Sequence, residues 1–385
     1  MRIHYVEVPW SHYGNHSREP SPCMEAGHLC RRIQRALLSI FIRKFCRYKK
    51  WHIKVLFIGL VIFIVTKCFS LERNEIIFRC ETDFGYTPYK FKNLDNISID
   101  PLNIHPFRYK FVANTVCEND EEIYLLTLVK SATHNYKNRL YIRQTWGKEA
   151  SLENRRLVFI LGYSEVQQAS IEYENQVFKD IIQEDFQDNY WSNTYKMEMA
   201  FSWITKYCNS AKYILFVDDD MFVNMQNSLK YLSSIDRSNV DYLYSGFLVE
   251  KPFPIRDFSD KHYVSWEDYP FDCFPPYIPS GTVFFNKATI NKFQKVIPYI
   301  PHFREDDVYL GIVAQKVGIV PSDISFLIRL GNGSPHAKYI PCFISDHGYS
   351  TSELFQEAYR ELQTNTISID YIMRVCVNDI NRPGH

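Results

Sequence analysis

The sequence predicts an α/β domain built on a central, mostly parallel β-sheet. Two observations support this prediction. Several short apolar segments, rich in β-branched and aromatic residues, have the composition of buried strands. Between them lie segments in which apolar residues recur at the spacing of one helix face. Strands that alternate with helices are typical of parallel sheets, and ligands of such sheets bind beyond the carboxyl ends of the strands.

The predicted strands and helices follow one another from Glu122 onwards. The strands are residues 122–130 (EIYLLTLVK), 156–161 (RLVFIL), 212–217 (KYILFV), 241–249 (DYLYSGFLV) and 282–286 (TVFFN). Two helix stripes lie between the second and third strands: Ile171, Val177, Phe178, Ile181 and Ile182, and then Met197, Ala200, Phe201, Ile204 and Cys208. With 385 residues, the chain is long enough to bury a sizeable core around such a sheet.

A basic cluster and an apolar segment precede this domain. Residues 31–50 carry eight Lys and Arg side chains and no acid. Residues 51–70 follow with an uncharged centre, and their length suffices to cross a thin bilayer. No small-residue cleavage site follows the apolar run, which argues against a cleaved signal peptide. Because positive charge stays in the cytosol, we expect a type II membrane protein with a lumenal body.

The chain therefore divides into four predicted parts. These are a cytosolic basic tail (1–50), a transmembrane signal anchor (51–70), a lumenal stem (71–120) and a folded lumenal domain (121–385). Six of the ten cysteines lie beyond the anchor, an even number that suits disulfides in an oxidising compartment, although their pairing stays open: Cys80, Cys117, Cys208, Cys273, Cys342 and Cys376. The 44 basic and 44 acidic side chains balance, so nucleic acid is not an expected partner.

Three consecutive carboxylates stand where the third predicted strand should leave the sheet. The stretch reads AKYILFVDDDMFVN, with Asp218, Asp219 and Asp220 between two apolar runs. A polar turn after a strand is the simpler interpretation, but three adjacent carboxylates repel one another unless a cation neutralises them. Manganese or magnesium prefers such oxygen ligands and completes its shell with phosphate oxygens. A lumenal, membrane-anchored enzyme that uses a nucleotide substrate is most simply a sugar transferase.

The body of the chain resembles the β1,3-galactosyltransferase and β1,3-N-acetylglucosaminyltransferase family of Golgi enzymes. The resemblance runs from about Ile123 to His347. Six motifs in the family's order carry it: NRLYIRQTWG (138–147), FILG (159–162), DIIQEDFQDNYWSNTYK (180–196), VDDDMFVN (217–224), KPFPIRDFSDKHYVSWEDYPFDCFPPY (251–277) and EDDVYLG (305–311). One departure concerns the segment after Tyr277, where Ile278 and Pro279 replace the family's usual cysteine or glycine-rich run, so that the sugar stays open.

The resemblance implies a GT-A fold, of Rossmann-like type, for the catalytic domain. It also implies a UDP-sugar donor, a divalent metal (Mn²⁺ or Mg²⁺) and inversion at the anomeric carbon to give a β1,3 linkage. Galactose is the favoured sugar and N-acetylglucosamine the other candidate, with the 3-hydroxyl of a glycan on a glycoprotein or glycolipid as acceptor. The Golgi membrane is the expected location. The alternative is a catalytically silent, membrane-anchored sugar-binding or scaffold protein on the same fold.

The aspartate triplet and a late histidine are the candidate metal and nucleotide ligands. We expect Asp220 to bind the metal directly, while Asp218 and Asp219 orient the ribose of the nucleotide and the surroundings of the ion. His347 matches a histidine of the family, and the resemblance alone implies that it completes the metal shell. A lone histidine is more often plain structure.

The candidate general base lies at the start of a later helix. Val308, Ile312, Val313 and Val317 define that helix, which should end at Gly318. Asp306 and Asp307 stand in its first turn. Acidic residues also favour a helix N-terminus without any catalytic role. The resemblance implies that Asp307 is the base, with Asp306 as the second candidate.

Three basic residues have two possible roles each. Arg139 and Arg143 are four residues apart, so they share a face of any helix there. They are predicted to grip the diphosphate or uracil, or else to form structural ion pairs. Lys196 has the same alternatives, namely neutralising phosphate or pairing with a nearby acid.

Overall fold

A computed structural model describes the chain at Phe91, Leu94 and Ile97 and over residues 100–118, 122–250, 252–330 and 337–364. The predicted anchor at 51–70 lies outside these residues. Within the part of the chain that is described, no helix is both long and apolar enough to span a membrane.

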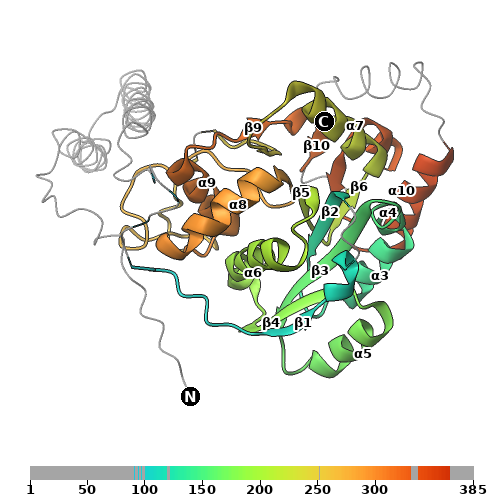
Figure 1. Ribbon diagram of the computed structural model, residues 1–385, viewed down its shortest axis with the longest axis horizontal. Coiled ribbons are helices and arrows are strands. Elements are labelled where there is room, and N and C mark those ends of the chain that lie inside the picture. Colours follow the sequence, from blue (N-terminus) through green and yellow to red (C-terminus); the bar gives the residue numbers. More distant parts are fainter. Residues whose placement is uncertain are drawn as a thin grey trace, which may run out of the picture. The chain divides into compact units, whose positions relative to one another are not determined.

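The main body is an α/β structure around a central sheet, as predicted (Figure 1). The strand order is β1-β4-β3-β2-β5-β8-β7-β9. The strands are β1 (Tyr109–Val112), β2 (Ile123–Lys130), β3 (Arg155–Tyr163), β4 (Ile181–Gln187), β5 (Ala211–Asp218), β7 (Tyr244–Gly246), β8 (Thr282–Asn286) and β9 (Ser322–Asp323). A smaller sheet has the order β10-β11-β6, from β6 (Met221–Val223), β10 (Ile328–Arg329) and β11 (Ser345–His347).

The central sheet is mixed, although its middle is parallel. Strands β4, β3, β2 and β5 run parallel to one another, whereas β1 is antiparallel to β4 and β8 is antiparallel to both β5 and β7. The expectation of a mostly parallel sheet is therefore correct for the middle and incomplete for the edges. Between β7 and β8 the described residues form no helix, so the chain returns without the crossover that a parallel pair requires.

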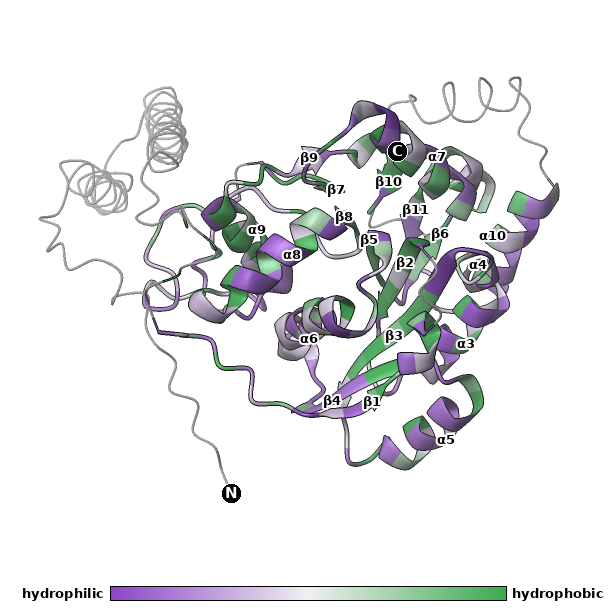
Figure 2. Cartoon of the chain, in the orientation of Figure 1, coloured by the Kyte–Doolittle hydropathy of each residue, from purple (hydrophilic) through white to green (hydrophobic). Residues whose placement is uncertain are grey.

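Helices cover both faces of the central sheet. Figure 1 shows α6, α8 and α9 on one side and α3, α4 and α10 on the other. The helices are α3 (Tyr136–Gln144), α4 (Trp146–Glu149), α5 (Gln168–Phe178), α6 (Asn193–Tyr207), α7 (Met225–Ser238), α8 (Lys287–Val296), α9 (Asp306–Val317) and α10 (Ser352–Thr364). Short 3-10 turns are η2 (Asn114–Cys117), η3 (Tyr190–Ser192), η4 (Ile297–Tyr299), η5 (Ser325–Leu327) and η6 (Ala337–Cys342). Because both faces are covered, the middle strands are apolar along most of their length (Figure 2).

Two predicted helices differ in how well their limits agree with the structure. Helix α9 ends before Gly318, whose φ of 72° suits glycine, so this prediction is confirmed. The first predicted stripe was wrong in part, because α5 stops at Phe178 and Lys179 takes the left-handed conformation. Ile181 and Ile182 instead begin strand β4, where both are fully buried. Two adjacent apolar residues suit a strand covered on both faces as well as they suit a helix.

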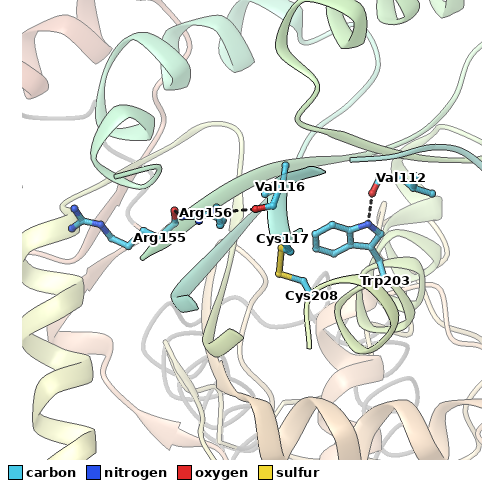
Figure 3. Close-up of a disulfide and its surroundings, with 7 residues drawn as sticks. All are labelled: Val112, Val116, Cys117, Arg155, Arg156, Trp203 and Cys208. Carbon is cyan, nitrogen blue, oxygen red and sulfur yellow. Dashed lines mark hydrogen bonds between the residues drawn. A yellow bond between two sulfur atoms is a disulfide. The ribbon is translucent and has the colours of Figure 1, made fainter. Parts of the chain in front are cut away.

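Residues expected at the end of the stem contribute to the folded body. Strand β1 pairs with β4, and the carbonyl of Val112 accepts a hydrogen bond from Trp203 Nε1 at 2.5 Å. A disulfide joins Cys117 to Cys208 (Figure 3). The Arg156 side chain donates to the carbonyl of Val116, at 2.9 Å. One of the pairings that the sequence left open is thereby defined.

Among the described residues, 253–273 belong to a compact unit separate from the main body. The guanidinium of Arg256 lies 3.9 Å from the ring centroid of Trp266. It donates hydrogen bonds to four backbone carbonyls, those of Val264, Ser265, Tyr269 and Phe271. This arginine therefore organises the interior of the segment. Trp266 is about half exposed, whereas Tyr269 is buried.

Candidate active site

Lys130 joins two parts of the site. It is the last residue of β2 and pairs in register with Asp218, the last residue of β5. Its Nζ atom lies 3.1 Å from Oδ1 of Asp218 and 2.6 Å from Oδ2 of Asp306, the first residue of α9. Burial alone lowers the pKa of Lys130, but the two carboxylates raise it overall, so the side chain is a buried cation. The aspartate triplet and the candidate base helix thus meet at one lysine.

Asp219 points into the protein. Its carboxylate accepts hydrogen bonds from Ser131 Oγ at 2.6 Å and from Asn135 Nδ2 at 3.0 Å. Asn138 Nδ2 donates to its backbone carbonyl at 3.3 Å. Burial raises the pKa of Asp219, and the hydrogen bonds from Ser131 and Asn135 work in the opposite direction. This aspartate holds the turn after β5 against the loop after β2.

Asp220 and His347 form the open side of the site. Strand β11 pairs with β6 so that His347 lies opposite Met221. His347 Nε2 is 3.1 Å from Oδ2 of Asp220, and each side chain is about two-fifths exposed, at 43% and 40%. The amides of Gly348 and Tyr349 donate to the Asp220 carbonyl and fix the strand connection.

The donor chemistry of Asp220 and His347 fits a divalent ion. A carboxylate oxygen and an imidazole nitrogen stand side by side and are open to solvent, a combination that manganese accepts. The hydrogen bond to Asp220 raises the pKa of His347, as expected beside an uncompensated carboxylate. No group of three or more His, Cys, Asp and Glu side chains is placed to hold a metal among the described residues. Water and the phosphate oxygens of a nucleotide are the usual further ligands of such an ion.

The two acidic residues of α9 differ in their surroundings. Asp306 is 8% exposed, and its carboxylate is paired with Lys130. Asp307 is only partly buried and accepts a hydrogen bond from the amide of Val308 at 2.8 Å. Burial and the charge of Asp306 raise the pKa of Asp307 to about 7. A carboxylate with this pKa exchanges a proton near neutral pH, as a general base must. We call Lys130, Asp218, Asp306 and Asp307 the lysine cluster.

Arg139 and Arg143 form a second buried network. Arg139 is fully buried and donates to both carboxylate oxygens of Glu174, at 2.9 and 2.7 Å. Arg143 reaches Glu174 at 2.7 Å and makes two bonds of 2.8 Å to Asp180. We call Arg139, Arg143, Glu174 and Asp180 the arginine network. Both guanidinium groups are paired with carboxylates. This geometry favours structural ion pairs over binding of the diphosphate or uracil.

Lys196 also pairs with an acid. It is buried, and its Nζ atom lies 2.7 Å from Asp188 Oδ1 and 2.9 Å from the carbonyl of Ser131. The other Asp188 oxygen accepts a hydrogen bond from the amide of Thr133 at 2.6 Å. Lys196 therefore holds the loop after β2 through the Ser131 carbonyl and Asp188. These contacts favour a structural ion pair over phosphate binding.

The loop after β2 is the feature that sequence reasoning missed. Residues 130–133 (KSAT) contact the aspartate triplet, the base helix, the arginine network and Lys196. One signal was available, since these polar residues follow the first predicted strand at its carboxyl end, where parallel sheets bind ligands. Nothing in the sequence showed that one lysine reaches two carboxylates from different elements.

Comparisons with known proteins agree with this site. The galactosyltransferase family model matches residues 137–325, a range that includes the triplet and both acids of α9. Lactosylceramide 1,3-N-acetyl-beta-D-glucosaminyltransferase of Homo sapiens is 32% identical over 330 residues, which cover 79% of this chain and 84% of that protein. Beta-1,3-galactosyltransferase brn of Drosophila melanogaster is 38% identical over 202 residues, which cover 52% of this chain and 62% of that protein.

The class of protein follows from these findings. The chain is a glycosyltransferase. It belongs to the family of β1,3-galactosyltransferases and β1,3-N-acetylglucosaminyltransferases, and it transfers a hexose.

Proposed function

We propose that this enzyme uses Asp307 as the base that deprotonates the 3-hydroxyl of an acceptor sugar, with galactose or N-acetylglucosamine supplied by its UDP carrier. One observation carries the proposal. Asp307 is a partly buried carboxylate with a pKa near 7, beside an acid that Lys130 already neutralises. A single displacement with inversion needs one general base, and its pKa should lie near the working pH.

The two acids of α9 have separate tasks in this proposal. The carboxylate of Asp306 is already engaged by Lys130, at 2.6 Å, so in this proposal it holds the helix start and does not meet the acceptor hydroxyl. Asp307 forms no such ion pair within the described part of the chain, and its oxygen not bonded to the Val308 amide is the proposed proton acceptor. Attack of the acceptor oxygen on the anomeric carbon breaks the sugar–phosphate bond, UDP leaves with that electron pair, and the hydroxyl proton passes to Asp307.

Asp220 and His347 would hold a divalent ion, Mn²⁺ or Mg²⁺, together with the diphosphate of the donor. Such an ion supplies positive charge that stabilises the leaving diphosphate. Asp218 lies beside Asp220, and burial together with the charges of Asp220 and Asp306 raises its pKa to about 6, although Lys130 acts in the opposite direction. This excess of negative charge supports the proposal of a cation at the open side. Asp219 keeps the turn in place through Ser131.

The proposed setting is the Golgi membrane, with a GT-A catalytic domain in the lumen. The basic residues 31–50 and the apolar residues 51–70 support a type II anchor. The disulfide between Cys117 and Cys208 supports an oxidising compartment.

A UDP-release assay tests the function. The full-length enzyme is incubated with Mn²⁺ and either UDP-galactose or UDP-N-acetylglucosamine, over a panel of α- and β-linked acceptors that includes lactosylceramide. We expect acceptor-dependent UDP release with one donor and a β1,3-linked product. Binding of UDP without release from any donor and acceptor pair would favour the silent sugar-binding alternative. Activity retained in Asp307→Asn would exclude Asp307 as the base.

A further inference from the structure

Lys130 is a buried cation at the junction of three elements. It ends β2, contacts the end of β5 at Asp218 and contacts the start of α9 at Asp306. Its side chain is only 3% exposed, so water does not screen these contacts strongly. The distance of 2.6 Å to Asp306 corresponds to a short, charge-assisted hydrogen bond. A contact of this kind holds the first residue of α9 against the sheet.

The orientation of Asp307 depends on that contact. Asp306 and Asp307 are the first two residues of α9, and Glu305, at its N-cap position, makes no capping hydrogen bond through its side chain. The helix start is therefore held at Asp306 by Lys130 rather than by a side-chain cap. Since adjacent helix residues share one rigid backbone turn, a shift at Asp306 moves Asp307 as well.

Charged groups on more than one element shift the pKa of Asp307. Asp306 and Glu305 raise its pKa from the same helix end, whereas Lys130, on β2, lowers it. Tyr244, on β7, and Tyr277, before β8, are near enough that the charge of Asp307 contributes to their raised pKa. Lys130 is therefore the cation that opposes the two neighbouring acids. Without it, we expect Asp307 to hold its proton to higher pH.

We propose that Lys130 is a positioning residue for the transfer reaction, which fixes the start of α9 through Asp306 and so sets the position and the charged surroundings of Asp307. The inference rests on the proposed role of Asp307 as the base. Lys130 acts through these two carboxylates and touches no reacting atom.

The pH profile of kcat/KM tests this role in the full-length enzyme. In Lys130→Met, we expect the acidic limb to move to higher pH by about one unit, because one charge at short range has an effect of this order. Below the limb, kcat/KM then falls about tenfold relative to the wild type. Lys130→Arg keeps the charge and should restore the wild-type limb. A limb at the wild-type pH in Lys130→Met would overturn the proposal, even if kcat/KM were lower at every pH.

Two controls separate this role from general damage. Lys212 forms an ion pair of the same length, 2.6 Å, with Asp236 at a more exposed position outside the lysine cluster, so Lys212→Met should leave the limb unchanged. If Lys130→Met does not fold, Lys130→Gln keeps a donor for Asp306 without the charge. It should shift the limb in the same direction, and a wild-type limb in this variant would equally overturn the proposal.

Asp307→Asn distinguishes the two levels of the argument. An inactive Asp307→Asn together with an unshifted limb in Lys130→Met would refute the role of Lys130 alone. An active Asp307→Asn would refute the proposed base, and with it the inference drawn from it.

Discussion

The lysine cluster and the arginine network are both sets of charges built around buried basic side chains on the same sheet, but their charges balance differently. The arginine network pairs two guanidinium groups with two carboxylates, and the arginines lower the pKa of Glu174 even though burial raises it. The lysine cluster has one cation for three carboxylates, and two of them have a raised pKa, about 6 for Asp218 and about 7 for Asp307.

This difference in charge balance suggests different roles for the two sets, one structural and one catalytic. A balanced buried network stabilises one conformation, and removing a partner leaves an uncompensated charge. An unbalanced one costs stability, and it persists in enzymes where a substrate, a metal or a transferred proton completes it. We propose on this ground that the excess of negative charge in the lysine cluster marks the catalytic part of the sheet edge.

The largest effect is expected from neutralising the base. Asp307→Asn should lower kcat by a factor of about 10² to 10⁴, the range that general-base catalysis supplies. UDP binding, measured by calorimetry in the presence of Mn²⁺, should remain. As a matched control, Asp260→Asn changes an acid of the separate 253–273 unit and should leave kcat unchanged.

Breaking the balanced network should instead affect stability. Glu174→Gln leaves Arg139 and Arg143 short of negative charge in a buried place, so we expect the free energy of unfolding to fall by roughly 3 kcal/mol at pH 7. Urea unfolding followed by circular dichroism measures this loss. The acidic limb of kcat/KM should not move, and a shifted limb would show that the network is part of the reaction site.

Stability should depend on pH in opposite ways for the two sets. The folded-state pKa of Asp307 is raised to about 7, so the unfolded chain loses this proton first and stability falls as the pH rises from about 4 to 7. Asp307→Asn removes that loss and should raise the unfolding temperature at pH 7.5. Glu174 has a lowered pKa, so its stabilisation is present above its unfolded value and is lost as pH falls through the folded one.

Thermal unfolding of the wild type and Asp307→Asn at pH 5 and 7.5 tests the Asp307 side of this contrast, because the window of Glu174 lies at lower pH. We expect Asp307→Asn to be more stable than the wild type at pH 7.5 and closer to it at pH 5. Equal unfolding temperatures for the wild type and Asp307→Asn at both pH values would contradict the raised pKa.

The smallest effect concerns the open side of the site. His347→Ala removes one of two adjacent donors, so the Mn²⁺ concentration for half-maximal activity should rise about 10-fold or more, as for the loss of a supporting ligand. The outcome that contradicts this role is an unchanged Mn²⁺ dependence with folding intact. A matched control is His134→Ala, since His134 is not among the site residues.

Local patterns in the sequence predicted several elements well. Residues 282–286 form β8 within the predicted limits, and the apolar spacing before Gly318 defined α9. The first is a short apolar run typical of a buried strand, and the second has a helical period and a glycine at its end. Strand β4 was missed because Ile181 and Ile182 continue a helical spacing, and only the conformation of Lys179 ends that helix.

The motifs identified the family and the acidic residues, because these depend on residue type and order along the chain. The sequence alone also distinguished Asp306 from Asp307 through the resemblance, without a physical reason for the choice. The structure offers one. Asp306 is paired with Lys130, whereas Asp307 has a raised pKa.

The sequence by itself determined the α/β class, the carboxylates that gather at the sheet edge and the glycosyltransferase family, because these follow from local period, composition and motif order. Only the tertiary structure decided which charges meet. Arg139 and Arg143 are balanced by acids 31 to 37 residues away, while Lys130 reaches Asp306 across a separation of 176 residues. Such contacts depend on how strands and helices pack. The spacing of residues along the chain does not show which distant residues become neighbours.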